Sequence, residues 1–254
     1  MEPVRIIPCL DMLNGRVVKG VHFVELKDVA DPVEAATAYC KQGADEIAFL
    51  DITATFEGRQ TMFDVATKVS EVIDCPFTIG GGIKSLADVE SALAAGASCA
   101  SISSAAFRDP DMIGEAVKEF GGNTIIVAID ADASDVMPSG REVYIDGGRT
   151  ATGKDATEFA KEMADLGVGQ ILPTSKKTDG TTEGYDLQLT REIAEATGRP
   201  IIASGGAGKL DDFYLAATEG KANGLLAASV FHYGTFTIGQ VKDYLKEKGV
   251  AVRE

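Results

Sequence analysis

Two stretches of the sequence decide the fold: residues 76–96 read PFTIGGGIKSLADVESALAAG, and residues 200–220 read PIIASGGAGKLDDFYLAATEG. When the chain is shifted by 124 residues, eight of the 32 positions from 76 to 107 are identical, whereas average residue usage predicts about two. The same shift places residues 45–51 over 169–175, and a shift of 119 pairs Asp11 with Asp130. The chain therefore contains an internal duplication, with halves of about residues 1–120 and 121–254.

Short apolar runs alternate with helix-length amphipathic segments along both halves. In residues 76–96, for example, Ser85 is placed to cap a helix and Asp88 follows three residues later. Runs that are apolar throughout are typical of parallel strands covered on both faces. We expect eight strands, near residues 4–11, 45–52, 76–80, 99–104, 123–130, 169–175, 200–204 and 223–228. Eight β/α units in about 250 residues, with no linker between the halves, predict one α/β domain: a (β/α)8 TIM barrel built from two homologous half-barrels.

The composition excludes some partners and locations. The 254 residues include 24 Lys+Arg and 39 Asp+Glu, so the net charge of −15 argues against nucleic acid and anionic membranes as partners. There is no signal-peptide core and no apolar run of about 20 residues, and a cytoplasmic location is expected. No C-x-x-C spacing occurs, so we expect reduced thiols at all four cysteines: Cys9, Cys40, Cys75 and Cys99.

The two glycine turns, residues 80–82 and 205–208, each follow a strand and begin a helix. Glycine lets the backbone approach an oxyanion, and the helix N-terminus favours negative charge there, although a tight turn without a ligand explains either one alone. A strand that ends in small residues follows each turn, as in the phosphate sites common on such barrels. The expected phosphate-binding residues are Gly82, Ser103, Ser104, Gly205, Gly206, Ala228 and Ser229. Two related phosphate sites imply a substrate with a phosphate at each end.

Asp11 and Asp130 end two apolar strands, on the face of the barrel where catalysis takes place. They are candidates for a general acid and a general base, and the alternatives are a helix cap or a lysine partner. We expect no cofactor and no metal, because Asp130-x-Asp132 lacks a third ligand. Lys19, in the polar segment NGRVVKG (14–20), is interpreted either as part of a flexible lid or as a solvated lysine. Four further residues could hydrogen-bond substrate hydroxyls: Asp51, Thr174, Ser175 and Asp179.

The chain resembles the cyclase subunit family of imidazole glycerol phosphate synthase, a barrel of histidine biosynthesis. RIIPCLD, NGRVVKG, FLDITA, GGGI, VAIDA, GYD, IIASGGAGK and LAASVFH stand where that family has them, between residues 3 and 252. The resemblance implies that ammonia attacks a bisphosphorylated ribulosyl intermediate, which then yields imidazole glycerol phosphate and an aminoimidazole carboxamide nucleotide. It also implies that Asp11 and Asp130 carry the acid–base steps, that Lys19 closes over the substrate, and that a glutaminase subunit supplies the ammonia.

The sequence departs from that family at the barrel entrance, where four charged residues normally gate the ammonia. Arg5 and Glu46 are present, but Cys99 and Gln170 replace a lysine and an acid, and a neutral pair is not expected to hold a salt-bridged ring. Ser98 removes a carboxylate that the family offers to its glutaminase, and the loop at 177–181 reads KTDGT instead of DRDGT. We therefore expect cyclase-type chemistry with weakened coupling to a glutaminase.

Three other functions are compatible with the same residues. The sister isomerase of the pathway, which performs an Amadori rearrangement, shares the duplication, both phosphate turns and both aspartates. A related amidotransferase barrel acting on another sugar would fit the altered loop near residues 176–179. The third alternative is a non-catalytic phosphosugar-binding paralogue, which the presence of Asp11, Asp130 and Lys19 argues against.

Overall fold

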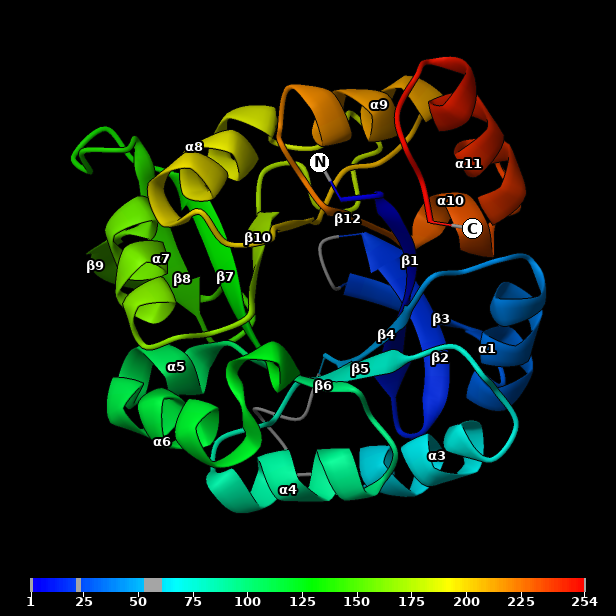
Figure 1. Cartoon of the computed structure of the whole chain (residues 1–254), viewed down its shortest axis with the longest axis horizontal. Coiled ribbons are helices and arrows are strands. Elements are labelled where there is room, and N and C mark those ends of the chain that lie inside the picture. Colours follow the sequence, from blue (N-terminus) through cyan, green and yellow to red (C-terminus); the bar gives the residue numbers. More distant parts are fainter. Residues whose placement is uncertain (1, 22–23, 53–60, 254) are drawn as a thin grey trace.

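Eight parallel strands close into a barrel in the computed structural model, which describes residues 2–21, 24–52 and 61–253 (Figure 1). The side chains of residues 19–21, 24–29 and 61 are also outside the description. The parallel ladders run β11-β12-β1-β4-β5-β6-β7, and β10 pairs with β7. Single bridges from Ile171 to Ile201 and from Thr174 to Ser204 join β10 to β11 and complete the ring. The expected (β/α)8 barrel is thus confirmed.

All eight expected strands are present, with ends shifted by a few residues. Their apolar runs are buried on both faces, which is why the sequence signal for them is continuous and not alternating. The barrel strands are β1 (Arg5–Leu13), β4 (Ile47–Asp51), β5 (Phe77–Gly80), β6 (Cys99–Ile102), β7 (Ile125–Ala133), β10 (Gln170–Ser175), β11 (Ile202–Ala203) and β12 (Gly224–Ala227).

Two antiparallel hairpins were not expected from the sequence. The first strand of each half extends beyond the barrel: β1 pairs with β2 (Arg16–Val21), which pairs with β3 (Val24–Ala30). In the second half, β7 pairs with β8 (Arg141–Ile145), which pairs with β9 (Thr150–Asp155). Residues 16–20 therefore form strand β2 in place of a loop, with Lys19 opposite Lys27, and a role of this segment as a lid stays a prediction.

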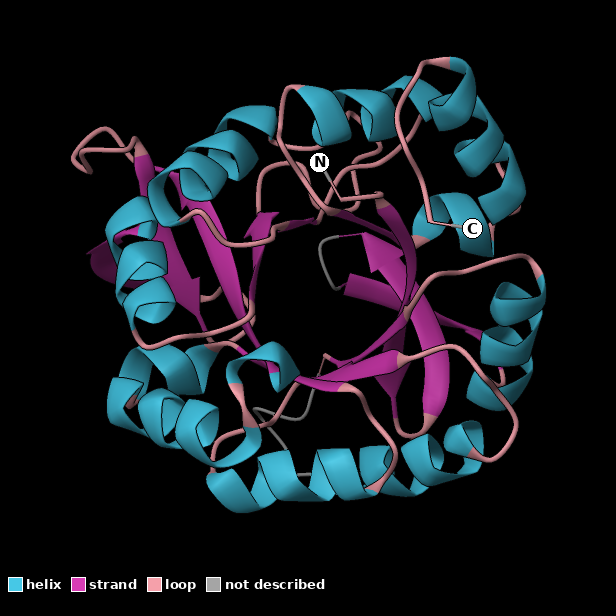
Figure 2. Cartoon of the chain, in the orientation of Figure 1, coloured by secondary structure: helices cyan, strands magenta, loops and turns pink. Residues whose placement is uncertain are grey.

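Helices surround the barrel and cover the outer face of its strands (Figure 2). Asp31 caps the first of them through its carboxylate, which accepts hydrogen bonds from the backbone N–H groups of Val33 and Glu34. No helix in the described part of the chain is long and apolar enough to cross a membrane. The helices are α1 (Pro32–Lys41), α3 (Thr61–Ser70), α4 (Leu86–Ala94), α5 (Ser104–Arg108), α6 (Pro110–Phe120), α7 (Ala156–Asp165), α8 (Leu187–Thr197), α9 (Leu210–Thr218), α10 (Ser229–His232) and α11 (Ile238–Glu247), with a 3-10 turn at Gly122–Thr124.

The duplication in the sequence is also visible in the hydrogen bonds. Asp45 N–H donates to Ile6, and the equivalent Gly169 N–H donates to Ile125. The shift of 124 holds only as far as the turn after α9, where Lys221 is an additional residue with φ of +58°. Beyond it the equivalence becomes 125: Thr78 pairs with Cys99 in one half and Ile202 with Gly224 in the other. Phe107, which a shift of 124 aligns with Phe231, therefore corresponds to His232. Ser104 corresponds to Ser229, and each of the two is the first residue of a short helix.

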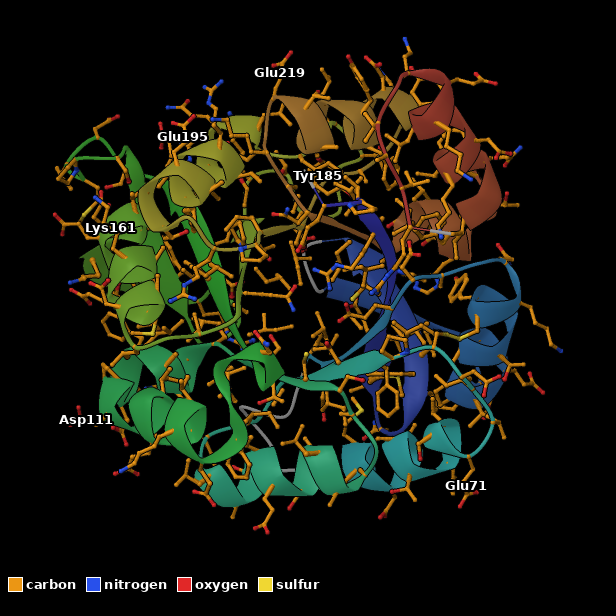
Figure 3. The ribbon with its side chains drawn as sticks, viewed as in Figure 1. Glu71, Asp111, Lys161, Tyr185, Glu195 and Glu219 are labelled. Atoms are coloured by element: carbon orange, nitrogen blue, oxygen red, sulfur yellow. A yellow bond between two sulfur atoms is a disulfide. The ribbon has the colours of Figure 1, made fainter. Side chains whose placement is uncertain are left out.

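Two apolar layers stabilise this arrangement. One lies between the strands and the helices and contains most of the buried residues, whereas the charged side chains labelled in Figure 3 point outward from the helices. The other fills the barrel interior with side chains from seven of its strands: Ile7, Cys9, Ala48, Cys99, Ile126, Leu172, Ile202 and Leu226. This second layer separates the carboxyl ends of the strands from the opposite end of the barrel.

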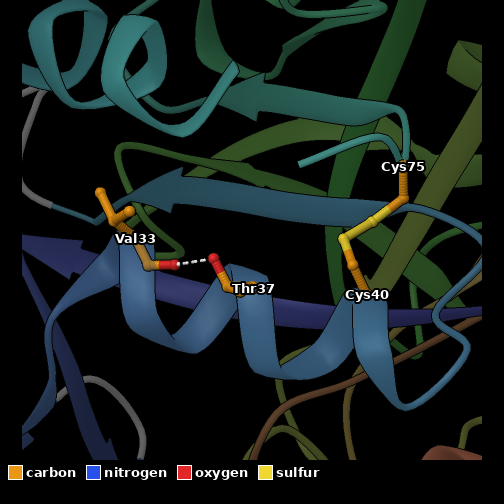
Figure 4. The surroundings of a disulfide bond; sticks show 4 residues. All are labelled: Val33, Thr37, Cys40 and Cys75. Carbon is orange, nitrogen blue, oxygen red and sulfur yellow. Dashed lines mark hydrogen bonds between the residues drawn. A yellow bond between two sulfur atoms is a disulfide. The ribbon is translucent and has the colours of Figure 1, made fainter. Parts of the chain in front are cut away.

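Two of the four cysteines form a disulfide, which corrects the expectation of four reduced thiols. Cys40 at the end of α1 is bonded to Cys75 just before β5, with 6.1 Å between the Cα atoms (Figure 4). That distance lies within the usual range for disulfides. The two residues are 35 positions apart and meet through the fold, so their spacing in the sequence carries no signal. Cys9 and Cys99 are buried thiols.

Candidate functional site

A cavity of about 420 Å³ lies at the carboxyl ends of the barrel strands. Twelve of the expected site residues line it: Asp11, Asp51, Gly82, Ser103, Ser104, Asp130, Thr174, Asp179, Gly205, Gly206, Ala228 and Ser229. They come from both halves of the chain. A pocket of this size, at this face of the barrel, is where enzymes with this fold bind their substrates.

Asp11 and Asp130 face the cavity from opposite walls. They occupy equivalent places on β1 and β7, which are four strands apart in the ring of eight. Asp11 is 7 % exposed, and its Oδ1 lies 3.5 Å from the thiol sulfur of Cys9, which also lines the cavity. A ligand that fills the cavity therefore has one carboxylate on each side.

Asp130 has the electrostatic properties of a group that exchanges protons near neutral pH. The pKa of Asp130 is raised from 3.8 to about 6 as the net result of three causes: burial and the negative charge of Asp179 raise it, and the positive charge of Lys176 lowers it. Burial is the largest cause because the charged form loses its hydration inside the barrel. An acid with a pKa of about 6 is ionised in most molecules at pH 7 and is still basic enough to accept a proton.

The glycine turn after β5 forms the first candidate anion cradle, which we define as Gly81, Gly82, Ser103 and Ser104. Gly81 has φ of +86°, and a Cβ atom there would lie 2.1 Å from the carbonyl oxygen of Asp51, so only glycine fits. Ser104 Oγ accepts a hydrogen bond from the backbone N–H of Asp146 (2.9 Å), in the turn between β8 and β9. The unexpected hairpin is thereby fastened to the first cradle.

The glycine turn after β11 forms the second candidate anion cradle, which we define as Gly205, Gly206, Ala228 and Ser229. Gly206 has φ of +102°, and a Cβ atom there would lie 2.1 Å from the carbonyl oxygen of Gly184. Gly205 packs against Asp179 and its carbonyl accepts from Thr178 Oγ1 (3.2 Å), so the loop after β10 closes this side of the cavity.

The two cradles differ in charge. Lys84, Arg108 and Arg149 line the cavity beside the first cradle, whereas no Lys or Arg is among the described residues that line it beside the second. Arg108 also holds the hairpin turn through two short hydrogen bonds to the carboxylate of Asp146 (2.7 and 2.8 Å). None of these three cations was predicted from the sequence. Arg149 was missed because the hairpin that brings it to the cavity was itself not expected.

Because the cations lie beside the first cradle, we expect Arg149 to contact an anionic group of the substrate. The change Arg149→Met is expected to raise the KM for an anionic substrate about tenfold and to leave kcat nearly unchanged, because a charge-assisted contact present in both ground and transition states is lost. Steady-state kinetics measure this, with the exposed Arg191→Met as the control for loss of one charge. An unchanged KM in Arg149→Met would show that this guanidinium does not contact the substrate.

Comparison with known protein families is consistent with this geometry. The family model described as "Histidine biosynthesis protein" matches residues 5–237, which include both half-barrels and both aspartates. The chain belongs to this family.

Two predicted site residues of this histidine biosynthesis barrel do not appear in the cavity lining. Ser175 is 3 % exposed and is not among the cavity-lining residues, so the structure does not bring it to the site. The side chain of Lys19 lies outside the described residues. The ring nitrogens of His232 have partners within the fold: they lie 2.7 Å from Tyr39 Oη and 2.9 Å from the carbonyl oxygen of Cys9.

The barrel entrance of this family member keeps a polar cluster at the amino ends of the strands, which we define as Arg5, Glu46, Thr78 and Gln170. Arg5 donates to Glu46 (2.7 Å) and to Gln170, and Thr78 donates to the other oxygen of Glu46 (2.6 Å). Gln170 stays attached to this cluster through its amide oxygen, which accepts from Arg5, but as a neutral group it makes no ion pair. Thr78 was not identified from the sequence.

Cys99, the remaining predicted gate residue, has a different partner. Its thiol donates to the carbonyl oxygen of Asn123 (3.4 Å). Burial, together with the charge of Glu46, raises the pKa of Cys99 to about 11, so the thiol is neutral at pH 7. Compared with the four-charge pattern of the cyclase family, the entrance therefore has one ion pair, one amide and one thiol.

Proposed function

We propose that the protein is an enzyme of the cyclase type: it uses ammonia to convert a bisphosphorylated ribulosyl aminoimidazole carboxamide intermediate into imidazole glycerol phosphate and an aminoimidazole carboxamide nucleotide. One observation carries the proposal. Two carboxylates on opposite walls of one cavity are flanked by two related glycine turns, which suits a ligand with a phosphate at each end.

Each group has a role in this proposal. The two anion cradles hold the phosphates and align the substrate across the barrel axis. Asp130, with its pKa of about 6, accepts protons from the attacking nitrogen as the new bond forms. Asp11, from the facing wall, donates the proton that the departing group needs when the substrate is cleaved. The remaining polar groups, Asp51, Thr174 and Asp179, orient the sugar hydroxyls.

The entrance cluster favours the cyclase over the sister isomerase. Arg5, Glu46, Thr78 and Gln170 lie at the end of the barrel opposite to the cavity, below the apolar interior layer with its small members Cys9, Ala48 and Cys99. An isomerase needs no second reactant, whereas ammonia delivered by a partner needs a route along the barrel axis. With two of the four charges absent, we propose that coupling to a glutaminase partner is weakened.

Three assays of the purified protein test the proposal. We expect turnover of the bisphosphorylated ribulosyl substrate with ammonium chloride, and at least about tenfold lower turnover when a histidine-pathway glutaminase and glutamine replace the ammonia. Equal rates from both nitrogen sources would contradict the weakened coupling. No turnover with ammonia would contradict the cyclase assignment, and conversion of the aldose precursor of this substrate would support the isomerase in its place.

A further inference from the structure

The segment after β10 places a lysine where it contacts three parts of the second half-barrel. Lys176 Nζ lies 3.4 Å from Asp132 Oδ2 on β7 and 3.5 Å from the centre of the Tyr144 ring on β8. Its backbone N–H donates to the carbonyl oxygen of Ala131 (2.9 Å), so the main chain is fixed as well. The ammonium group is held by an ion pair and a cation–π contact at the same time.

The stem of the Lys176 side chain packs on the hairpin turn. A Cβ atom built at Gly148, where φ is +75°, would lie 3.2 to 3.5 Å from the Cε, Cδ and Cγ atoms of Lys176. Gly148 lies between Gly147 and Arg149, and both of these line the cavity. Lys176 is 28 % exposed, so most of its surface is covered by these neighbours. The position of the Lys176 side chain therefore affects the part of the hairpin turn that lines the cavity.

The same ammonium group lies next to Asp130. Tyr144, whose ring it covers, is the direct cross-strand partner of Asp130 in the β7–β8 ladder. Lys176 is the cation that lowers the pKa of Asp130, against the effects of burial and of Asp179. The elements packed against Asp130 carry other charged groups: Asp132 on β7, Arg141 and Glu142 on β8, and Asp146 and Arg149 in the turn after β8. Asp179 after β10, Asp11 on β1 and Asp51 on β4 line the same cavity.

We propose that Lys176 is a positioning residue of this site: its ammonium group ties the β8–β9 hairpin to β7 and supplies the positive charge beside the carboxylate of Asp130. It acts on the substrate only through these two neighbours, because it is not itself a cavity-lining residue. As a device for the acid–base steps, this role rests on the proposed function. The electrostatic effect of Lys176 on Asp130 does not rest on the proposed function, and it can be measured without any substrate.

The test is a titration of Asp130 by carbon-detected NMR of side-chain carboxyl groups, in the wild type and three variants. In Lys176→Met, which keeps an apolar stem but no charge, we expect the titration midpoint of Asp130 to rise by about one pH unit. Lys176→Arg is expected to keep the wild-type midpoint, because it restores the charge and the contact with the Tyr144 ring. The matched control is Lys177→Met, which removes the same charge from the exposed neighbouring residue.

The outcomes separate this inference from the proposed function. An unchanged midpoint in Lys176→Met, or an equal rise in Lys177→Met, overturns the inference even if the enzyme is an active cyclase. A rise confined to Lys176→Met supports it even if no turnover is found with any substrate. If turnover is found, the pH profile of kcat/KM is expected to shift upward by the same amount in Lys176→Met and to return in Lys176→Arg. A purely structural role would instead lower activity equally at every pH.

Discussion

Replacing Asp130 by asparagine is expected to lower kcat with ammonia by about 10²- to 10⁴-fold, the usual contribution of a positioned acid or base. Asparagine has nearly the same shape as aspartate and stays on the same strand, so the phosphate cradles keep their positions and KM should change only a few-fold. Steady-state kinetics at saturating ammonium chloride measure both constants. The matched control is Asp135→Asn, an exposed carboxylate in the turn that follows the same strand.

A kcat in Asp130→Asn that stays above about a tenth of the wild-type value would contradict the role of Asp130 as the base. The wild-type pH profile gives a second check. Because the pKa of Asp130 is about 6, its reactive ionised form is lost below that pH, and kcat/KM should fall about tenfold per unit on the acidic side. The acidic limb should be absent from the residual activity of Asp130→Asn.

The same pKa has a consequence for stability. The folded-state pKa of Asp130 lies above the unfolded value of 3.8, so the charged form is disfavoured on folding. The free-energy cost of ionising Asp130 in the folded protein is absent below about pH 4, grows between pH 4 and 6, and reaches its full size above about pH 6. Asp130→Asn removes it, so the variant should be about 1–3 kcal/mol more stable than the wild type at pH 7.5 and equally stable near pH 4. Gain of stability with loss of turnover is typical of a catalytic group.

The barrel and the centre of its site could be predicted from the sequence because their signals are local. The strands β1 and β7 are apolar runs ending in Asp11 and Asp130, and the glycine turns follow their strands directly. The hairpin strands lack such a signal: β9 reads TATGKD and only its last residue is buried. It forms because β7 continues beyond the barrel and offers an edge to β8. The contacts of Lys176 depend on that hairpin, and so does the place of Arg149 at the cavity.

The duplication contained a further indication. In each half a strand pair lies between the first strand and the first helix: β2 with β3 before α1, and β8 with β9 before α7. The sequence REVYI (141–145), with its β-branched and aromatic residues, is typical of a strand. Because the two halves are duplicates, a hairpin found in one half predicts a hairpin at the equivalent place in the other. The disulfide has no such indication, because Cys40 and Cys75 meet only after β4 and β5 pair.

The change Arg5→Leu is expected to lower the free energy of unfolding by about 3–5 kcal/mol, the usual cost of leaving one partner of a buried ion pair without its counter-charge. The Arg5 and Glu46 side chains are only 18 % and 7 % exposed, so water cannot replace the guanidinium. Thr78 still donates to Glu46, but a neutral hydroxyl does not balance the charge. Urea denaturation at pH 7.5 measures the difference.

A second variant shows whether the stability lost in Arg5→Leu comes from the unbalanced charge of Glu46 or from changed packing. The double variant Arg5→Leu/Glu46→Gln has no buried charge, and glutamine can still accept from Thr78, so most of the lost stability should return. In the exposed pair of Lys154 and Glu162, with side chains 31 % and 53 % exposed, Lys154→Met should cost less than about 1 kcal/mol. If the double variant is as unstable as Arg5→Leu, Arg5 stabilises the barrel by packing alone, and the entrance cluster is not held together by its remaining ion pair.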